Sequence, residues 1–315
     1  MNRKAVIFGI KGPWLRKNEK LFFKREKPWG IILFSRNVRN IVQLKNLVHD
    51  IKNLFQDKKY PILIDQEGGR VSRLDKIIDT TIFSQSYFGK LYNKDKKAFY
   101  YYYKIYISKV CDILRNVGVN INTAPVLDVR RKNAHKIIGD RSFSFYPTDV
   151  SKLGKLCIDF YKEYKIATVI KHIPGHGLSK CDSHYKTPII KNDKKELIKK
   201  DFKPFKECKS FFAMTAHAVY SIYDSNNTAT HSKTVINNVI RKHINFKGLL
   251  ISDDISMKSL KYKLEKNAIK ALHAGCNLIL HCNGNIKEMS RLVKVIPKID
   301  KFVQIKTSQF YKFLG

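Results

Sequence analysis

Eight short apolar runs recur along the chain, and each is followed by a polar or helix-compatible stretch. The apolar residues are consecutive, without the alternation expected of a strand that has one face in water. Such runs are typical of parallel strands that are buried on both faces between helices. We therefore expect eight strands, at residues 5–10, 30–34, 61–64, 119–124, 167–172, 211–215, 248–252 and 277–281.

Segments with helical periodicity lie between these runs, at residues 38–55, 99–117, 150–164 and 232–243. Repeated alternation of strand and helix predicts an α/β fold, a single (β/α)8 TIM-type barrel. A chain of 315 residues fits one catalytic barrel domain over residues 1–315. A doubly wound open sheet is the alternative, but no glycine-rich dinucleotide turn follows the first run.

Polar side chains capable of chemistry cluster where the expected strands end. In a barrel of this kind the active site is built at the carboxyl-terminal face, from strand ends and the loops that follow them. Chance placement would scatter such residues through the helices as well. The residues at these positions are Asp65, Gln66, Asp128, Lys171, His172, His217, Asp253, Asp254 and Asn283.

Asp253 follows the run at residues 248–252 directly and comes immediately before Asp254. A carboxylate at a strand end can attack an anomeric carbon and form a covalent glycosyl-enzyme, which divides one difficult displacement into two easier ones. Turn formation is the competing interpretation, and Asp254 is suited to be the N-cap of the next helix.

Residues 171–188 carry three histidines, an aspartate, two glycines and two prolines in one expected loop. Asp182 and His184 are two positions apart, so they lie on one side of an extended segment. A carboxylate bonded to an imidazole prepares it for general acid/base work. His172, His176, Asp182 and His184 are also potential metal ligands, but their spacing matches no metal signature, and we expect no metal.

The segment DQEGGRVSR at residues 65–73 follows the third expected strand. Its glycines permit a tight turn, and Asp65 with Arg70 or Arg73 can exchange hydrogen bonds with sugar hydroxyls. A surface turn with an ion pair is the alternative. Arg141 has the same two interpretations. A Schiff-base role for Lys171 is not excluded by a single residue, but a hydrogen bond to substrate is favoured.

Lys and Arg total 61 against 26 Asp and Glu, a net charge of +35. A polyanionic partner is one explanation. The lysines are spread along the chain, however, and no basic stripe is interleaved with aromatic residues. We attribute the charge to compositional drift and expect no specific nucleic acid partner.

The six cysteines form no C-x-x-C pair, so a metal cluster or a disulfide framework is not expected. No signal peptide is visible, and no apolar stretch is long enough to cross a bilayer. We expect a cytoplasmic monomer without membrane association.

Seven segments together resemble the family 3 glycoside hydrolases, in particular their bacterial β-N-acetylhexosaminidases. They occur in the same order through most of the chain, and the KH-x-PGHG…D-S-H and SDD segments are specific. The segments are GIILFSRN at 30–37, IDQEGGRVSR at 64–73, NTAPVLDV at 122–129, IGDRSF at 138–143, KHIPGHGLSKCDSH at 171–184, MTAH at 214–217 and GLLISDDISM at 248–257.

The resemblance implies a role for each matching residue. Asp253 is implied as the nucleophile, and His184 as the general acid/base supported by Asp182. Such enzymes need no cofactor and release N-acetylglucosamine from anhydro-muramyl peptides during cell-wall recycling. The residues implied to contact the sugar are Asp65, Arg73, Arg141, Lys171 and His172.

Two other functions stay open at this point. Phosphate in place of water would make the enzyme a phosphorylase, since a neutral histidine repels phosphate less than a carboxylate does. A basic nucleic-acid-binding relative with weakened catalysis is the other alternative, and retention of all eight implied residues argues against it.

Overall fold

The computed structural model describes residues 2–132, 134–179, 181–183 and 185–315. Eight parallel strands close into a barrel in the order β1-β10-β9-β7-β5-β4-β3-β2. The predicted (β/α)8 barrel is therefore confirmed, and each of the eight predicted runs supplies one barrel strand. The strands are β1 Lys4–Gly9, β2 Pro28–Leu33, β3 Ile62–Ile64, β4 Ile121–Asn122, β5 Ala167–Ile173, β7 Phe212–Thr215, β9 Leu249–Asp254 and β10 Leu278–His281.

The barrel strands are buried along most of their length. Every residue of β2, β3 and β7 is buried. Parallel register pairs Ile31 with Ile62 and Met214 with Ile251, so the apolar runs of neighbouring strands meet side by side. This arrangement explains the continuous apolar runs, because one face packs inside the barrel and the other against helices.

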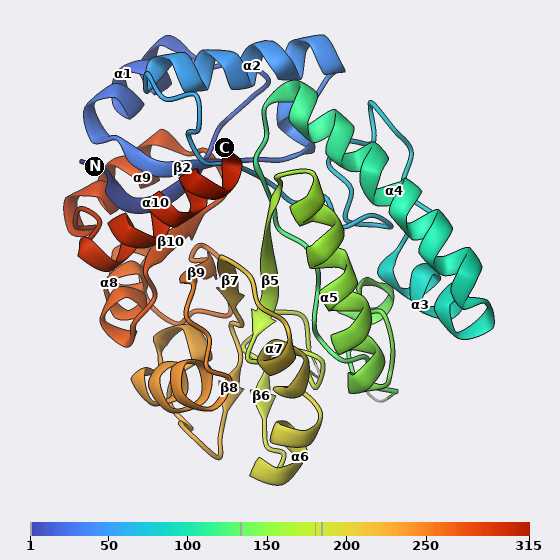
Figure 1. The fold of residues 1–315 in the computed structure, drawn as a ribbon. Coiled ribbons are helices and arrows are strands. Elements are labelled where there is room, and N and C mark those ends of the chain that lie inside the picture. The colour runs from blue at the N-terminus through green and yellow to red at the C-terminus, as the bar shows by residue number, and fades with distance from the viewer. Residues whose placement is uncertain (1, 133, 180, 184) are drawn as a thin grey trace.

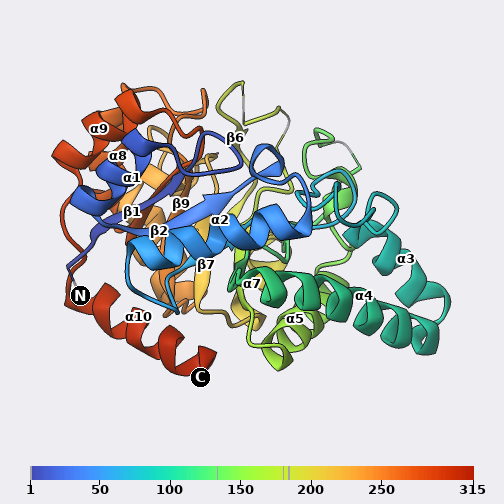
Figure 2. The ribbon, with the colours of Figure 1, turned by 90° about the horizontal axis from the view of Figure 1, so that it is seen from above.

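Helices surround the barrel and connect successive strands, as Figures 1 and 2 show. The segments predicted as helical at 38–55, 99–117 and 150–164 correspond to α2, α4 and α5. The helices are α1 Lys17–Glu26, α2 Ile41–Leu54, α3 Gln85–Lys94, α4 Lys96–Val117, α5 Pro147–Glu163, α6 Lys194–Lys199, α7 Lys203–Glu207, α8 Leu264–Ala274, α9 Ile286–Val295 and α10 Lys301–Leu314.

The predicted helix at 232–243 is present but has π-helical hydrogen bonding over η4, Val235–His243. Short 3-10 segments are η1 Ser35–Asn37, η2 Gly139–Arg141 and η3 Ala229–His231. A small two-stranded sheet of β6, Ile189–Ile190, and β8, Val219–Tyr220, was not predicted. It stands beside the barrel, after β5 and β7 (Figure 1).

Polar side chains fix where many helices begin. At six helices the residue before the first turn accepts a hydrogen bond from a backbone N–H that has no partner within the helix. These caps are Asn40 at α2, Ser84 at α3, Asp95 at α4, Asp193 at α6, Asn285 at α9 and Asp300 at α10.

The last helix, α10, packs at the amino-terminal end of the barrel strands, and Figure 2 shows it near both chain ends. Trp29 Nε1 donates to Thr307 Oγ1 at 2.9 Å. The rings of Phe310 and Phe212 lie 5.3 Å apart. These contacts cover part of that end with buried side chains. Among the described residues, no helix has the length and apolar character needed to span a membrane.

Candidate active site

A cavity of about 230 Å³ opens at the carboxyl-terminal end of the barrel strands. Its wall combines strand-end residues from β2, β3, β5, β7, β9 and β10 with residues of the loops that follow. The predicted residues Asp65, Arg73, Arg141, Lys171, His172 and Asp253 all line it. The fold therefore brings together, in one cavity, six predicted residues that come from four separate segments of the sequence.

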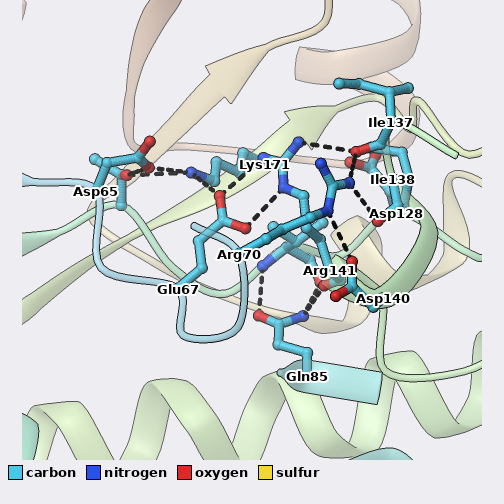
Figure 3. A network of polar contacts seen from close by, with 12 residues as sticks. Asp65, Glu67, Arg70, Gln85, Asp128, Ile137, Ile138, Asp140, Arg141 and Lys171 are labelled. Carbon is cyan, nitrogen blue, oxygen red and sulfur yellow. Dashed lines mark hydrogen bonds and ion pairs between the residues drawn. The ribbon is translucent and has the colours of Figure 1, made fainter. Parts of the chain in front are cut away.

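Five side chains of alternating charge form a chain of ion pairs along this cavity, and Figure 3 shows four of them, Asp65, Lys171, Glu67 and Arg141. Arg73 Nη2 lies 3.0 Å from Asp65 Oδ2, and the other oxygen of Asp65 lies 2.5 Å from Lys171 Nζ. Lys171 Nζ is also 2.5 Å from Glu67 Oε1. Glu67 then accepts two hydrogen bonds of 2.8 Å from Arg141.

Each carboxylate in this chain is held in its charged form. Removal from water would raise the pKa of Asp65, but Lys171 and Arg73 outweigh that effect and hold the pKa well below its ordinary value. For Glu67, burial is likewise outweighed by Arg141 and Lys171, and its pKa is lowered. Both acids therefore accept hydrogen bonds without donating any at neutral pH.

Residues of neighbouring loops support this chain of ion pairs. Arg70 donates to Asp140 Oδ1 at 2.8 Å and to backbone carbonyls that include Ile137 and Lys136. Gln85 joins β4's loop to the arginine segment, because its amide nitrogen donates to the carbonyls of Val126, at 2.9 Å, and Arg141, at 2.7 Å. Figure 3 shows Gln85 beside Arg141, at the end of the ion-pair chain away from Asp65.

The turn that carries Glu67 depends on two glycines. Gly68 and Gly69 have φ values of 89° and 59°, a region that side chains with a Cβ rarely adopt. A Cβ on Gly68 would also lie 2.4 Å from the Tyr106 hydroxyl. The predicted tight turn is present, and it directs Asp65 and Glu67 to the same cation, Lys171.

His172 is fixed by a buried aspartate that the sequence placed at a strand end without a role. Asp128 is fully buried, and its Oδ2 lies 2.6 Å from His172 Nδ1. The backbone N–H of His176 donates to Asp128 Oδ1 at 2.6 Å. Burial would raise the pKa of Asp128, but His172 and these bonds hold it lower. His172 Nδ1 is thereby occupied, which leaves Nε2 for a ligand in the cavity.

His176 also lines the cavity, and both of its ring nitrogens are buried without a hydrogen-bond partner among the described residues. Burial lowers its pKa to about 4, and the neighbouring His172 adds to the effect. The ring is therefore neutral at pH 7, with one nitrogen able to donate and the other to accept.

Asp253 is the penultimate residue of β9 and lines the cavity, with its Oδ1 accepting the backbone N–H of Asp254 at 2.8 Å. Removal from water favours its protonated form, but His217 and His172, with Lys171 and the Asp254 N–H, hold its pKa below the ordinary value. The result is an ionised carboxylate in a half-buried position. That state suits a nucleophile.

Asp254 has a structural role in the turn after β9. Its carboxylate accepts from the backbone N–H of Ser256 at 3.1 Å and from the Ser256 hydroxyl at 2.8 Å. The predicted N-cap role is wrong, because α8 begins only at Leu264 and Lys263 precedes it. His217 adds a further contact, since its Nε2 lies 3.1 Å from the Asp254 carbonyl oxygen.

The loop after β5 reaches the cavity. Ser183 is buried and lines it, and the carbonyl of the half-buried Asp182 accepts the backbone N–H groups of Tyr185 and Lys186. His184 lies outside the described residues, so its implied acid/base role and its pairing with Asp182 stay predictions. Gly177 in the same loop packs tightly, because a Cβ there would lie 1.9 Å from the Val129 carbonyl oxygen.

Metal binding has no support in the described part of the chain, where no group of three or more His, Cys, Asp or Glu side chains could hold an ion. A second, larger cavity of about 600 Å³ lies at the opposite end of the strands. Its described lining residues are apolar side chains, lysines and small polar groups, with no acid among them. Acid/base chemistry therefore points to the smaller cavity.

Glu67 is the main site residue that sequence reasoning missed. It lies within the recognised DQEGG segment, but Asp65 and the arginines alone were given roles there. An acid flanked in sequence by residues expected at a buried site is a signal for a buried ion pair, since unpaired buried charges are costly. Asp128 and His217 were noticed only as strand-end residues.

The chain matches the family model described as "Glycosyl hydrolase family 3 N terminal domain" over residues 13–309. It is 33% identical to the beta-hexosaminidase of Actinobacillus pleuropneumoniae serotype 3 over 88% of this chain and 81% of that protein. It is also 33% identical to the beta-hexosaminidase of Haemophilus ducreyi, over 98% of this chain and 91% of that one.

Two crystal structures of NagZ from Neisseria gonorrhoeae share the fold at 28% identity. The complex with zinc ion superposes with a TM-score of 0.86 and covers 99% of this chain and 90% of that one. The complex with N-trifluoroacetyl-D-glucosamine superposes with a TM-score of 0.84 and covers 100% and 91%. The resemblance found in the sequence thus extends to the backbone fold of solved relatives.

Proposed function

The chain belongs to glycosyl hydrolase family 3 and is a glycoside hydrolase, and from that premise we propose that it is a retaining exo-β-N-acetylglucosaminidase. The observation that carries the proposal is the ionised, half-buried carboxylate of Asp253 in a cavity that is also lined by members of a chain of hydrogen-bonding charges. A cavity of about 230 Å³ has the scale of one sugar ring with room for its substituent.

The ionised state of Asp253 supports its role as nucleophile. An oxocarbenium-like transition state develops positive charge at C1, so a carboxylate there both attacks and stabilises it. We assign Asp253 to attack C1 while the glycosidic oxygen leaves as an alcohol. The product of this step is an ester between the sugar and Asp253.

We assign the proton transfers to His184, assisted by Asp182. His184 as imidazolium gives its proton to the departing oxygen, and as imidazole it then takes a proton from the water that cleaves the ester. An imidazole titrates near neutrality, so it serves in both directions at pH 7. Ser183, which stands between these two residues in the sequence, lines the cavity, and this supports the assignment.

Sugar recognition falls to the ion-pair chain and to His172. Asp65 retains acceptor capacity beside Lys171 and Arg73, and Arg141 and His172 line the same cavity. Charged partners strengthen hydrogen bonds to hydroxyl groups in a water-poor site. The complex of the gonococcal relative with N-trifluoroacetyl-D-glucosamine supports an acetamido sugar as the bound unit.

For the natural substrate we propose N-acetylglucosamine joined to anhydro-muramyl peptides, handled in the cytoplasm during cell-wall recycling. The basis is the similarity to NagZ and to the bacterial beta-hexosaminidases. Release of N-acetylglucosamine from purified anhydro-muropeptides, followed by mass spectrometry, tests this part.

The first test compares a chromogenic N-acetyl-β-glucosaminide with the matching β-glucoside. Wild type should cleave the acetamido sugar alone, and Asp253→Ala should lower turnover by roughly three orders of magnitude or more. Asp254→Asn is the matched control. The Asp254 carboxylate stabilises a turn, so the loss of turnover in this variant should be much smaller.

Azide separates a lost nucleophile from a damaged fold. If Asp253 forms the covalent intermediate, azide should enter the space left in Asp253→Ala and give the α-glycosyl azide, the opposite anomer from the normal product. Full activity in Asp253→Ala would refute the assignment. Assays with and without phosphate, with product analysis, distinguish hydrolysis from phosphorolysis.

A further inference from the structure

Glu67 stands behind the wall of the cavity. Its side chain is 2% exposed, and it contacts the two cations Lys171 and Arg141, which line the cavity while Glu67 does not. Figure 3 shows its carboxylate between these two side chains. Any effect of Glu67 on a ligand must therefore pass through the cations that it holds.

The donors of both cations are directed by this contact. An ammonium group has three N–H donors. Those of Lys171 are matched by three acceptors, Asp65 Oδ1 at 2.5 Å, Glu67 Oε1 at 2.5 Å and Thr123 Oγ1 at 3.2 Å. Without Glu67 the ammonium is free to turn toward the cavity or farther onto Asp65.

Arg141 depends on Glu67 more strongly. Its Nε and Nη2 each donate to the Glu67 carboxylate at 2.8 Å, a two-bond contact that fixes the plane of the guanidinium. Among the residues that the structure describes, its guanidinium has one further hydrogen bond, a weaker one from Nη1 to the Ile137 carbonyl at 3.3 Å. The plane of the group, and hence which N–H edge faces the cavity, follows from the position of Glu67.

Charge balance gives Glu67 a second effect. The chain of ion pairs contains three cations, Arg73, Lys171 and Arg141, against two carboxylates, Asp65 and Glu67. Removing the charge of Glu67 leaves three cations against one carboxylate at a buried wall. Poorly screened excess positive charge attracts anions, whereas a sugar hydroxyl needs only directed donors and acceptors.

We propose that Glu67 is a positioning residue for substrate binding, which aims Arg141 at a neutral sugar, holds Lys171 on its carboxylate partners and makes the cavity reject small anions. The proposal rests on the proposed function, because the ligand of the cavity is taken to be the sugar of a glycoside. It adds a determinant of specificity that acts without touching the substrate.

Glu67→Gln removes the charge and keeps the size of the side chain. We expect its KM for the chromogenic N-acetyl-β-glucosaminide to rise roughly ten-fold or more, with a smaller change in kcat. Inorganic phosphate at millimolar concentration should inhibit this variant and leave wild type unaffected. A purely structural role would lower the active fraction and hence kcat, without creating inhibition by phosphate.

Glu67→Asp separates charge from position, and it also serves if Glu67→Gln does not fold. The variant retains a carboxylate, but its side chain is too short to hold both cations. The KM should therefore rise while phosphate still fails to inhibit. Asp140→Asn is the matched control. This variant removes a carboxylate that is 45% exposed and that forms an ion pair with Arg70. Both KM and phosphate sensitivity should stay at wild-type values.

Active wild type together with an unchanged KM in both Glu67 variants overturns the proposal and leaves the proposed function intact. Phosphate inhibition equal in wild type and Glu67→Gln likewise overturns the anion-rejecting role. Wild type that cleaves no N-acetyl-β-glucosaminide overturns the proposed function, and the role of Glu67 falls with it.

Discussion

The two ends of the barrel carry cavities of opposite character. At the carboxyl-terminal end, about 230 Å³ is bordered by charged groups that are removed from water and paired with one another. At the amino-terminal end, about 600 Å³ is bordered by Phe205, Phe246 and other apolar groups, with lysines around it. Of the five described lysines that line it, Lys306 is partly covered, and the exposed ones are Lys162, Lys206, Lys209 and Lys247.

The difference shows that volume alone does not identify a functional cavity. Parallel strands end together, and the side chains at their carboxyl ends converge from several loops onto one small space. There, each charge has a partner within hydrogen-bond distance, which fixes its direction. Around the larger cavity most of the lysines are exposed, so water and salt screen their charges.

Replacing Lys171 should produce the largest contrast between the two ends. Lys171→Met leaves Asp65 and Glu67 without their common partner, and unpaired buried charges cost about 3–5 kcal/mol of stability. Lys206→Met, at the larger cavity, should change stability by no more than about 0.5 kcal/mol. Urea denaturation measures both, and equal losses would erase the proposed distinction between the ends.

Acid should weaken the carboxyl-terminal end in two steps. The pKa of His176 falls from 6.5 to about 4 on folding, so the unfolded chain takes up its proton first and stability drops across that interval. Asp65, ordinarily at pKa 3.8, is held lower, so its contribution is present above 3.8 and disappears as pH falls further.

Thermal unfolding between pH 7 and pH 3 tests these two steps. His176→Gln should flatten the dependence between pH 6.5 and pH 4, whereas Asp65→Asn should flatten it below 3.8. Curves for both variants that run parallel to wild type would mean that neither group links folding to protons.

Filling the larger cavity should produce the smallest effect. Gln309 is exposed on α10 and lines that cavity, so Gln309→Trp adds bulk without disturbing a buried residue. We expect kcat/KM within about two-fold of wild type and stability within about 0.5 kcal/mol. A clear loss of kcat/KM with the fold intact would reveal that the two ends are coupled.

Most of the barrel could be predicted from the sequence because its strands are apolar on both faces and alternate with amphipathic helices. The π-helical bonding of η4 could not, since a wide helix and an α-helix present similar apolar periodicity over nine residues. The pairing of β6 with β8 was also beyond reach, because strands of two residues leave almost no pattern.

The site was predictable in its members and not in its contacts. Strand-end positions selected Asp65, Lys171, His172 and Asp253, and all of them line one cavity. Lys171 and Asp65 are 106 residues apart, and only closure of the barrel decides that they meet. The same limit hid Glu67, whose importance depends on two cations supplied by later parts of the chain.

The first strand of the ring has its neighbours at opposite ends of the sequence. β1 pairs with β2 on one side and with β10 on the other. Two backbone hydrogen bonds of 2.9 Å strengthen the closure of the barrel, from the N–H of Ala5 to the carbonyl of Pro297 and from the N–H of Ile299 to the carbonyl of Arg3. On a ribosome, β2 emerges soon after β1, whereas β10 emerges only after nearly all the intervening chain. Contacts between such distant segments form late, and an unpaired strand edge is a template for association. Until translation reaches β10, each nascent molecule therefore exposes an open edge to which the same segment of a neighbouring nascent chain can bind.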